Sequence, residues 1–81
     1  MNAPPDERIA ETLMALALAR ARGHGKSFCP SEAARALASD WRPLMPEVRR
    51  VAAGLPLRAL QRGRIVDPAV ARGPIRLRLE G

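Results

Sequence analysis

Two helices and the turn between them are encoded by residues 29–55, which read CPSEAARALASDWRPLMPEVRRVAAGL. Pro30 suits the first position of a helix because its ring fixes φ, and Glu32 then falls at the third position, where the acid of a capping box belongs. Pro43 and Pro46 disfavour helix in the residue before each of them, so residues 41–46 are predicted to form a turn or a single helical loop. The stretch therefore predicts one helix over about residues 30–39 and another over about residues 44–54.

The segments on either side of this stretch have different periods. Before it, apolar residues recur at helical spacing over about residues 6–22, with acidic residues near the start and Gly23 after the end, which predicts a helix. After it, apolar Ile75, Leu77 and Leu79 alternate with charged residues, which predicts a half-buried strand over about residues 74–80. Its expected partner is a strand over about residues 57–62. The residues between them, 63–73, have the turn chemistry of an exposed loop.

The resulting order is helix, helix, helix, strand, loop, strand. This order predicts an α+β fold, mainly α, of the winged helix-turn-helix type, in which three helices are followed by a two-stranded β wing. With 81 residues, the chain is expected to form a single winged-helix domain over residues 1–81. A domain of this size buries only about 60% of the surface of its unfolded chain. We therefore do not expect a large enzyme with a deep substrate cavity.

The sequence also resembles a family, the bacterial domain of unknown function 3253, which is described as winged-helix-like. The resemblance covers nearly the whole chain and rests on five motifs: CPSEAARAL (29–37), WRPLMPEVR (41–49), QRG (61–63), VDP (66–68) and RGPIRL (72–77). It implies the fold and a bacterial origin, and it brings no established activity. The family pattern has a longer stretch after Ala52 than this chain, which implies a short third helix here.

The residue types that usually carry catalysis or metal binding are scarce. Cys29 and His24 are the only pair that could serve as nucleophile and base, and a cysteine just before a helix is more often a packed small hydrophobe. One cysteine and one histidine do not make a metal site, and there is no phosphate-binding glycine loop. We therefore expect no enzyme activity, no cofactor and no metal. The absence of a signal-like start or a long apolar run predicts a cytoplasmic protein without a membrane span.

The charge distribution is the strongest indication of function. The chain carries 14 basic and 8 acidic residues, a net charge of +6, and the second half supplies the whole excess through nine arginines. Several of these arginines are expected to crowd onto the wing, where like charges on facing strands destabilise the sheet unless something compensates. Phosphate contacts would compensate, so we predict nucleic-acid binding through six residues: Arg42, Arg49, Arg50, Arg62, Arg64 and Arg72.

Other interpretations of the basic residues stay open. An acidic protein partner would also balance these charges, because winged helices serve as protein-interaction modules as well, and in that case no DNA would be bound. Trp41 beside Arg42 could be a nucleobase stacking site, but a tryptophan packed over the turn is favoured in a core that has only Phe28 as its other aromatic residue. The oligomeric state is not indicated by the sequence.

Overall fold

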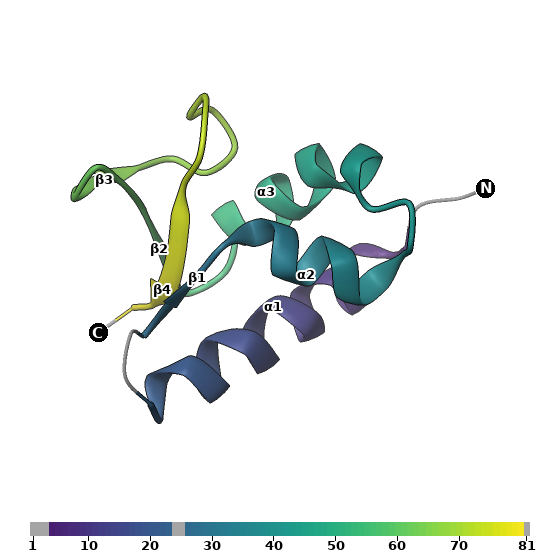
Figure 1. Cartoon of the computed structure of the whole chain (residues 1–81), viewed down its shortest axis with the longest axis horizontal. Helices are drawn as coiled ribbons and strands as arrows, with labels where there is room; N and C mark the ends of the chain where they lie inside the picture. The colour runs from purple at the N-terminus through teal and green to yellow at the C-terminus, as the bar shows by residue number, and fades with distance from the viewer. Residues whose placement is uncertain (1–3, 24–25, 81) are drawn as a thin grey trace.

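The computed structural model describes residues 4–23 and 26–80. Helix α1 (Asp6–Ala21) lies along the bottom of the molecule in the view of Figure 1. One stripe of α1 is fully buried, made by Ile9, Leu13 and Ala17 at spacings of four residues. The helix was predicted to reach residue 22, and it ends one residue earlier. The predicted helix is confirmed.

Helix α2 (Pro30–Leu37) begins with the predicted capping box. The backbone N–H of Cys29 donates to Glu32 Oε2 at 3.1 Å, so the acid at the third helical position satisfies the N–H of the residue before the helix. Phe28 and Ala33, one on each side of this cap, are both fully buried. The helix ends at Leu37 rather than at residue 39, because Ala38 already has an extended backbone.

A short turn leads from α2 into the next helix. Residues 42–44 form one turn of 3-10 helix, η1 (Arg42–Leu44), and α3 (Met45–Ala53) continues directly from it. This confirms the single helical loop predicted from the two prolines. Helix α3 has nine residues, and its buried side is made by Val48 and Ala52. The family resemblance implies a short third helix, and the length of α3 agrees with it.

The sheet differs from the predicted two-stranded wing. Among the described residues it has four strands in the order β1-β4-β2-β3, and each neighbouring pair is antiparallel. The strands are β1 (Ser27–Phe28), β2 (Leu57–Gln61), β3 (Arg64–Val66) and β4 (Arg76–Leu79). The predicted pairing of the two longer strands is confirmed, with Ala59 opposite Leu77. The prediction of only two strands was wrong, because β1 and β3 are too short to show a period in the sequence.

The prediction that residues 63–73 form one exposed loop was also wrong in its first part. Arg62 and Gly63 form a two-residue turn in which both residues have positive φ, 53° and 81°. Positive φ at both central positions defines a type I′ turn, whose twist matches that of an antiparallel hairpin. The turn therefore brings Arg64 opposite Gln61 and starts β3. The sequence concealed this turn because Arg-Gly replaces the usual Asn-Gly.

The helices and the sheet share one apolar core, and the fold is α+β. All three helices contact one another, and α1 also packs against β1 and β4. The buried apolar residues come from every layer: Ile9, Leu13, Ala17, Phe28, Ala33, Ala34, Leu44, Val48, Ala52, Leu57, Ala59, Ile75 and Leu77.

Candidate nucleic-acid interface

Three of the six arginines that we predicted to bind nucleic acid surround one hollow on the sheet side of the molecule. Arg62 lies in the β2–β3 turn, Arg64 starts β3, and Arg72 lies in the segment that returns to β4. All three are exposed, and none makes an ion pair within the described ranges. The hollow, which we call the basic hollow, has a volume of about 970 Å³ and is lined by Gln61, Arg62, Arg64, Val66, Arg72, Gly73 and Pro74. It has no acidic residue among these.

One side of the basic hollow is formed by the segment that returns to β4, and hydrogen bonds to its backbone carbonyl oxygens hold it in place. The side-chain amide of Gln61 donates to the carbonyl oxygens of Arg72 and Pro74, which ties the returning segment to β2. Gly73 has a φ of 86°, a conformation that favours glycine, and it bends the chain between those two carbonyls. Sequence reasoning missed Gln61. Its signal in the sequence was its place in the QRG motif (61–63) of the family resemblance.

The turn at Asp67 sets the start of the returning segment. Asp67 Oδ1 accepts a hydrogen bond from the N–H of Ala69 at 2.9 Å, and its carbonyl oxygen accepts from the N–H of Ala71, also at 2.9 Å. Pro68, the next residue of this turn, is buried. The carboxylate of Asp67 is therefore used for local backbone structure, as aspartates in turns commonly are. The Asp67 carboxylate does not line the basic hollow, so no carboxylate of the lining balances the positive charge there.

Arg49 contacts the segment that forms one side of the basic hollow. From α3 its guanidinium donates through Nη1 to the carbonyl oxygen of Ala71 and through Nη2 to that of Gly73, each at 2.7 Å. Two hydrogen bonds from one planar guanidinium hold both carbonyls at once. The structure therefore places this predicted phosphate ligand against the returning segment, half-buried between α3 and residues 71–73.

Arg50 is engaged with two carboxylates. It donates through Nη1 and Nη2 to both oxygens of Asp6, at 3.1 and 2.7 Å, and through Nε and Nη2 to Glu47. Hydrogen bonds from Arg50 hold the pKa of Asp6 below its ordinary value; desolvation, which raises it, is the next largest effect, and the positive charge of Arg50 adds a smaller lowering. Hydrogen bonds to Asp6 and Glu47 in turn raise the pKa of Arg50. The group joins α3 to α1.

Arg42 lies apart from the basic hollow, at the turn between α2 and α3. Its guanidinium carbon is 4.6 Å from the ring centroid of Trp41, and that of Arg35 is at the same distance. Trp41 itself is half-buried and packs against the core, as the favoured interpretation predicted. Arg35 was not among the predicted residues, since no sequence pattern indicates that it reaches the ring of Trp41. Cation–π contacts of this kind stabilise by about 0.5–1 kcal/mol at exposed sites.

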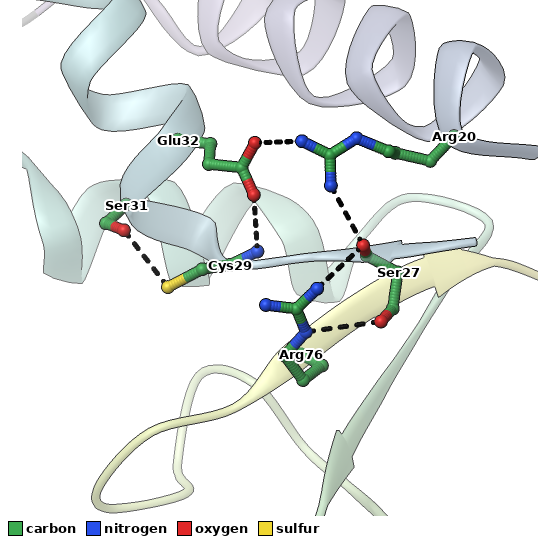
Figure 2. A network of polar contacts seen from close by, with 6 residues as sticks. All are labelled: Arg20, Ser27, Cys29, Ser31, Glu32 and Arg76. Carbon is green, nitrogen blue, oxygen red and sulfur yellow. Dashed lines mark hydrogen bonds and ion pairs between the residues drawn. The ribbon is translucent and has the colours of Figure 1, made fainter. Parts of the chain in front are cut away.

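A second polar cluster joins α1, β1, α2 and β4, and Figure 2 shows its six residues. Arg20 donates to Glu32 Oε1 and to the carbonyl oxygen of Ser27, while the other oxygen of Glu32 accepts from the N–H of Cys29. Arg76 donates to the same carbonyl oxygen of Ser27 at 2.8 Å, and to its hydroxyl at 3.2 Å. The cluster fixes the start of α2 against the first strand.

Cys29 is part of this cluster rather than of an evident reaction site. The hydroxyl of Ser31 donates to its Sγ at 3.0 Å, and the side chain is half-buried. The candidate base, His24, lies outside the described residues. Among residues 4–23 and 26–80, no three His, Cys, Asp or Glu side chains come close enough together to hold a metal ion.

The comparisons with known proteins identify a family. No helix in the described part of the chain is long and apolar enough to cross a membrane. No curated protein matches the sequence significantly. One family model does match, over residues 6–80, and it covers every helix and strand described above. The chain therefore belongs to the family described as "Protein of unknown function (DUF3253)".

Proposed function

We propose that this chain is a winged-helix protein that binds the phosphate backbone of nucleic acid without strong sequence preference, through the basic hollow. The element order α1, β1, α2, one 3-10 turn, α3 and then the antiparallel strands β2, β3 and β4 supports the winged-helix part of the proposal. The observation that carries the binding part is the basic hollow itself. Three exposed arginines without carboxylate partners in the described structure line one concavity.

Phosphate is the ligand that fits this arrangement best. A guanidinium offers a planar fork of donors that matches two phosphate oxygens, and clustered arginines bind successive phosphates along a backbone. Neutralising three phosphates releases their counterions, so the logarithm of the affinity should fall with the logarithm of the salt concentration with a slope of roughly −3. Arg49 contributes as a positioning residue, because it holds the carbonyls that flank Arg72.

The side chains of α3 argue for backbone contact rather than base reading. Base readers project Arg, Asn or Gln from the recognition helix. Here Arg49 binds backbone carbonyls and Arg50 binds two carboxylates, while Glu47 adds a negative charge beside them. The exposed positions that remain on α3 within the described structure are Pro46 and Ala53, which offer no hydrogen-bond donor from their side chains.

The test is a fluorescence-anisotropy titration of a labelled random duplex of about 20 base pairs at about 50 and 200 mM salt. The double variant R64A/R72A should bind about a hundredfold more weakly than the parent at the lower salt, since two phosphate contacts are lost. The matched control is R8A/R22A, which removes the same charge from two exposed arginines of the α1 region. Equal losses in both variants, or no duplex binding by the parent at low salt, would refute the proposal.

A further inference from the structure

A second basic surface lies on the opposite side of the sheet from the basic hollow. Side chains alternate between the two faces of a strand, and the register gives the members of each face. Arg58 lies opposite Arg78, Leu60 lies between Arg76 and Ile65 on the neighbouring strands, and these five residues define what we call the outer sheet face. Their sequence neighbours Leu57, Ala59 and Leu77 are buried on the other face, against the helices.

No helix of the described chain packs on the outer sheet face, where Arg58, Ile65 and Arg76 are exposed and Leu60 and Arg78 are half-buried. Figure 1 shows the three helices gathered to one side of the sheet, and α1 packs against the core side of β1 and β4. Ile65 keeps 68% of its surface exposed, which is unusual for a large apolar residue in the middle of a strand. Its strand, β3, is also the edge of the sheet, so its outward N–H and C=O groups have no strand partner there.

The charges on this face are unbalanced. Arg58 and Arg78 are directly opposite each other across β2 and β4, an arrangement that destabilises an antiparallel pair. Neither makes an ion pair in the part of the chain that the structure describes. Arg76 is held in a fixed position by its two hydrogen bonds to Ser27, at 2.8 and 3.2 Å, so its guanidinium is oriented before any partner arrives. Preorganised groups lose less entropy when they bind.

We propose that the outer sheet face binds an acidic segment of a partner protein, whose carboxylates meet Arg58, Arg76 and Arg78 and whose apolar residues cover Leu60 and Ile65. Charge complementarity selects an anionic partner. The two apolar side chains select a protein segment rather than a nucleic acid, because single-stranded nucleic acid is bound on aromatic side chains and this face has none. This surface is separate from the basic hollow, so the inference does not depend on the proposed function.

The probe is a fluorescein-labelled peptide of about ten residues, an ordinary upper length for a strand. Every second residue is in turn glutamate or valine and the residues between them are serine, so that carboxylates and apolar side chains share one face of the extended peptide. It is titrated with the full chain in fluorescence anisotropy at low salt. The informative variant is R58E, which places a carboxylate opposite Arg78 and removes the like-charge pair. We expect R58E to melt at a higher temperature than the parent and to bind the peptide about tenfold more weakly or worse.

The matched control is R8E, which makes the same charge change at an exposed position of α1 and should leave peptide binding unchanged. Ile65→Ser should also weaken peptide binding without weakening duplex binding, since it removes only apolar contact. Equal losses in R58E and R8E would show attraction to net charge alone and would overturn the proposal. It would also be overturned if the peptide did not bind, or if R58E weakened duplex binding as strongly as peptide binding. Failure of the proposed function is a separate outcome. In that case R64A/R72A would lose no more duplex affinity than R8A/R22A does, while the peptide binding of R64A/R72A would still be intact.

Discussion

Arg62 combines a strained backbone with a place in the lining of the basic hollow, so one substitution should change stability and binding in opposite directions. Its φ of 53° is in the left-handed region, which glycine and asparagine adopt far more readily than arginine does. Asn-Gly is the favoured pair in a type I′ turn. Because asparagine is several-fold enriched in this conformation, Arg62→Asn should stabilise the fold by about 0.5–1 kcal/mol. For a domain of this length, that gain raises the melting temperature by about 2–8 °C.

The same substitution should weaken nucleic-acid binding. Removing one phosphate contact reduces the magnitude of the salt slope by about 0.9, which corresponds to about a tenfold loss of affinity at 50 mM salt. Circular-dichroism melting gives the change in stability, and the duplex titration at two salt concentrations gives the change in slope. If the strained conformation of Arg62 serves binding, its substitution should raise the melting temperature and lower the duplex affinity together.

The chain provides its own control for this experiment. Lys26 also has a positive φ, 45°, and also carries one positive charge, but it does not line the basic hollow. Lys26→Asn should therefore raise the melting temperature by a similar amount without the loss of duplex affinity. If Arg62→Asn left the melting temperature unchanged, the argument from backbone strain would fail. If both variants lost affinity equally, the basic hollow would not be the binding site.

Three further outcomes follow from the intramolecular contacts. Arg49→Ala should lower stability by about 1–3 kcal/mol and speed hydrogen exchange at the amides of residues 69–73, because two charged hydrogen bonds are lost; unchanged exchange would contradict this. Since Arg50 lowers the pKa of Asp6, their pair stabilises the fold above about pH 4, and this contribution disappears as the pH falls through the folded-state pKa. Asp6→Asn should therefore make urea-unfolding stability less dependent on pH between about 4 and 2, and an unchanged dependence would contradict it. Glu32→Ala should destabilise by about 1–2 kcal/mol in thermal melting, more than Ser31→Ala does, because it removes the acceptor of the capping box.

The helices could be predicted because their signals are local. The capping box at Cys29 and Glu32 and the apolar spacing of Ile9, Leu13 and Ala17 each lie within a few residues of the element that they define. The ends of all three helices fall within two residues of their predicted positions, as is usual for such boundaries. Strands β1 and β3 could not be predicted in the same way. Strand β1 has two residues and depends on β4, which lies far along the chain. Strand β3 has three residues and pairs with the neighbouring strand β2, across an Arg-Gly turn that the sequence does not signal.

The candidate site was predictable in composition but not in arrangement. The excess of arginine in the second half is visible in the sequence, and three of those residues do meet around the basic hollow. The engagement of Arg50 with Asp6 joins residues 44 positions apart, and that of Arg49 with Gly73 joins residues 24 positions apart. Neither follows from periodicity. Both contacts engage predicted phosphate ligands with other parts of the fold.

The distribution of carboxylates determines which side of the protein a polyanion would meet first. All three ion pairs in the described structure join helical residues: Arg20 with Glu32, and Arg50 with both Asp6 and Glu47. The segment that forms β2, β3 and β4, residues 54–80, holds six arginines against Asp67 and Glu80 only. The helical layer is thus largely self-neutralised, while both faces of the sheet stay positive. Since attraction between exposed charges is strong only within about a Debye length of 8–10 Å, an approaching polyanion is drawn to the sheet and not to the helices. Raising the salt concentration should therefore weaken duplex binding and peptide binding alike. The two ligands are proposed to bind opposite faces, so only the variants of each face can tell the two binding modes apart.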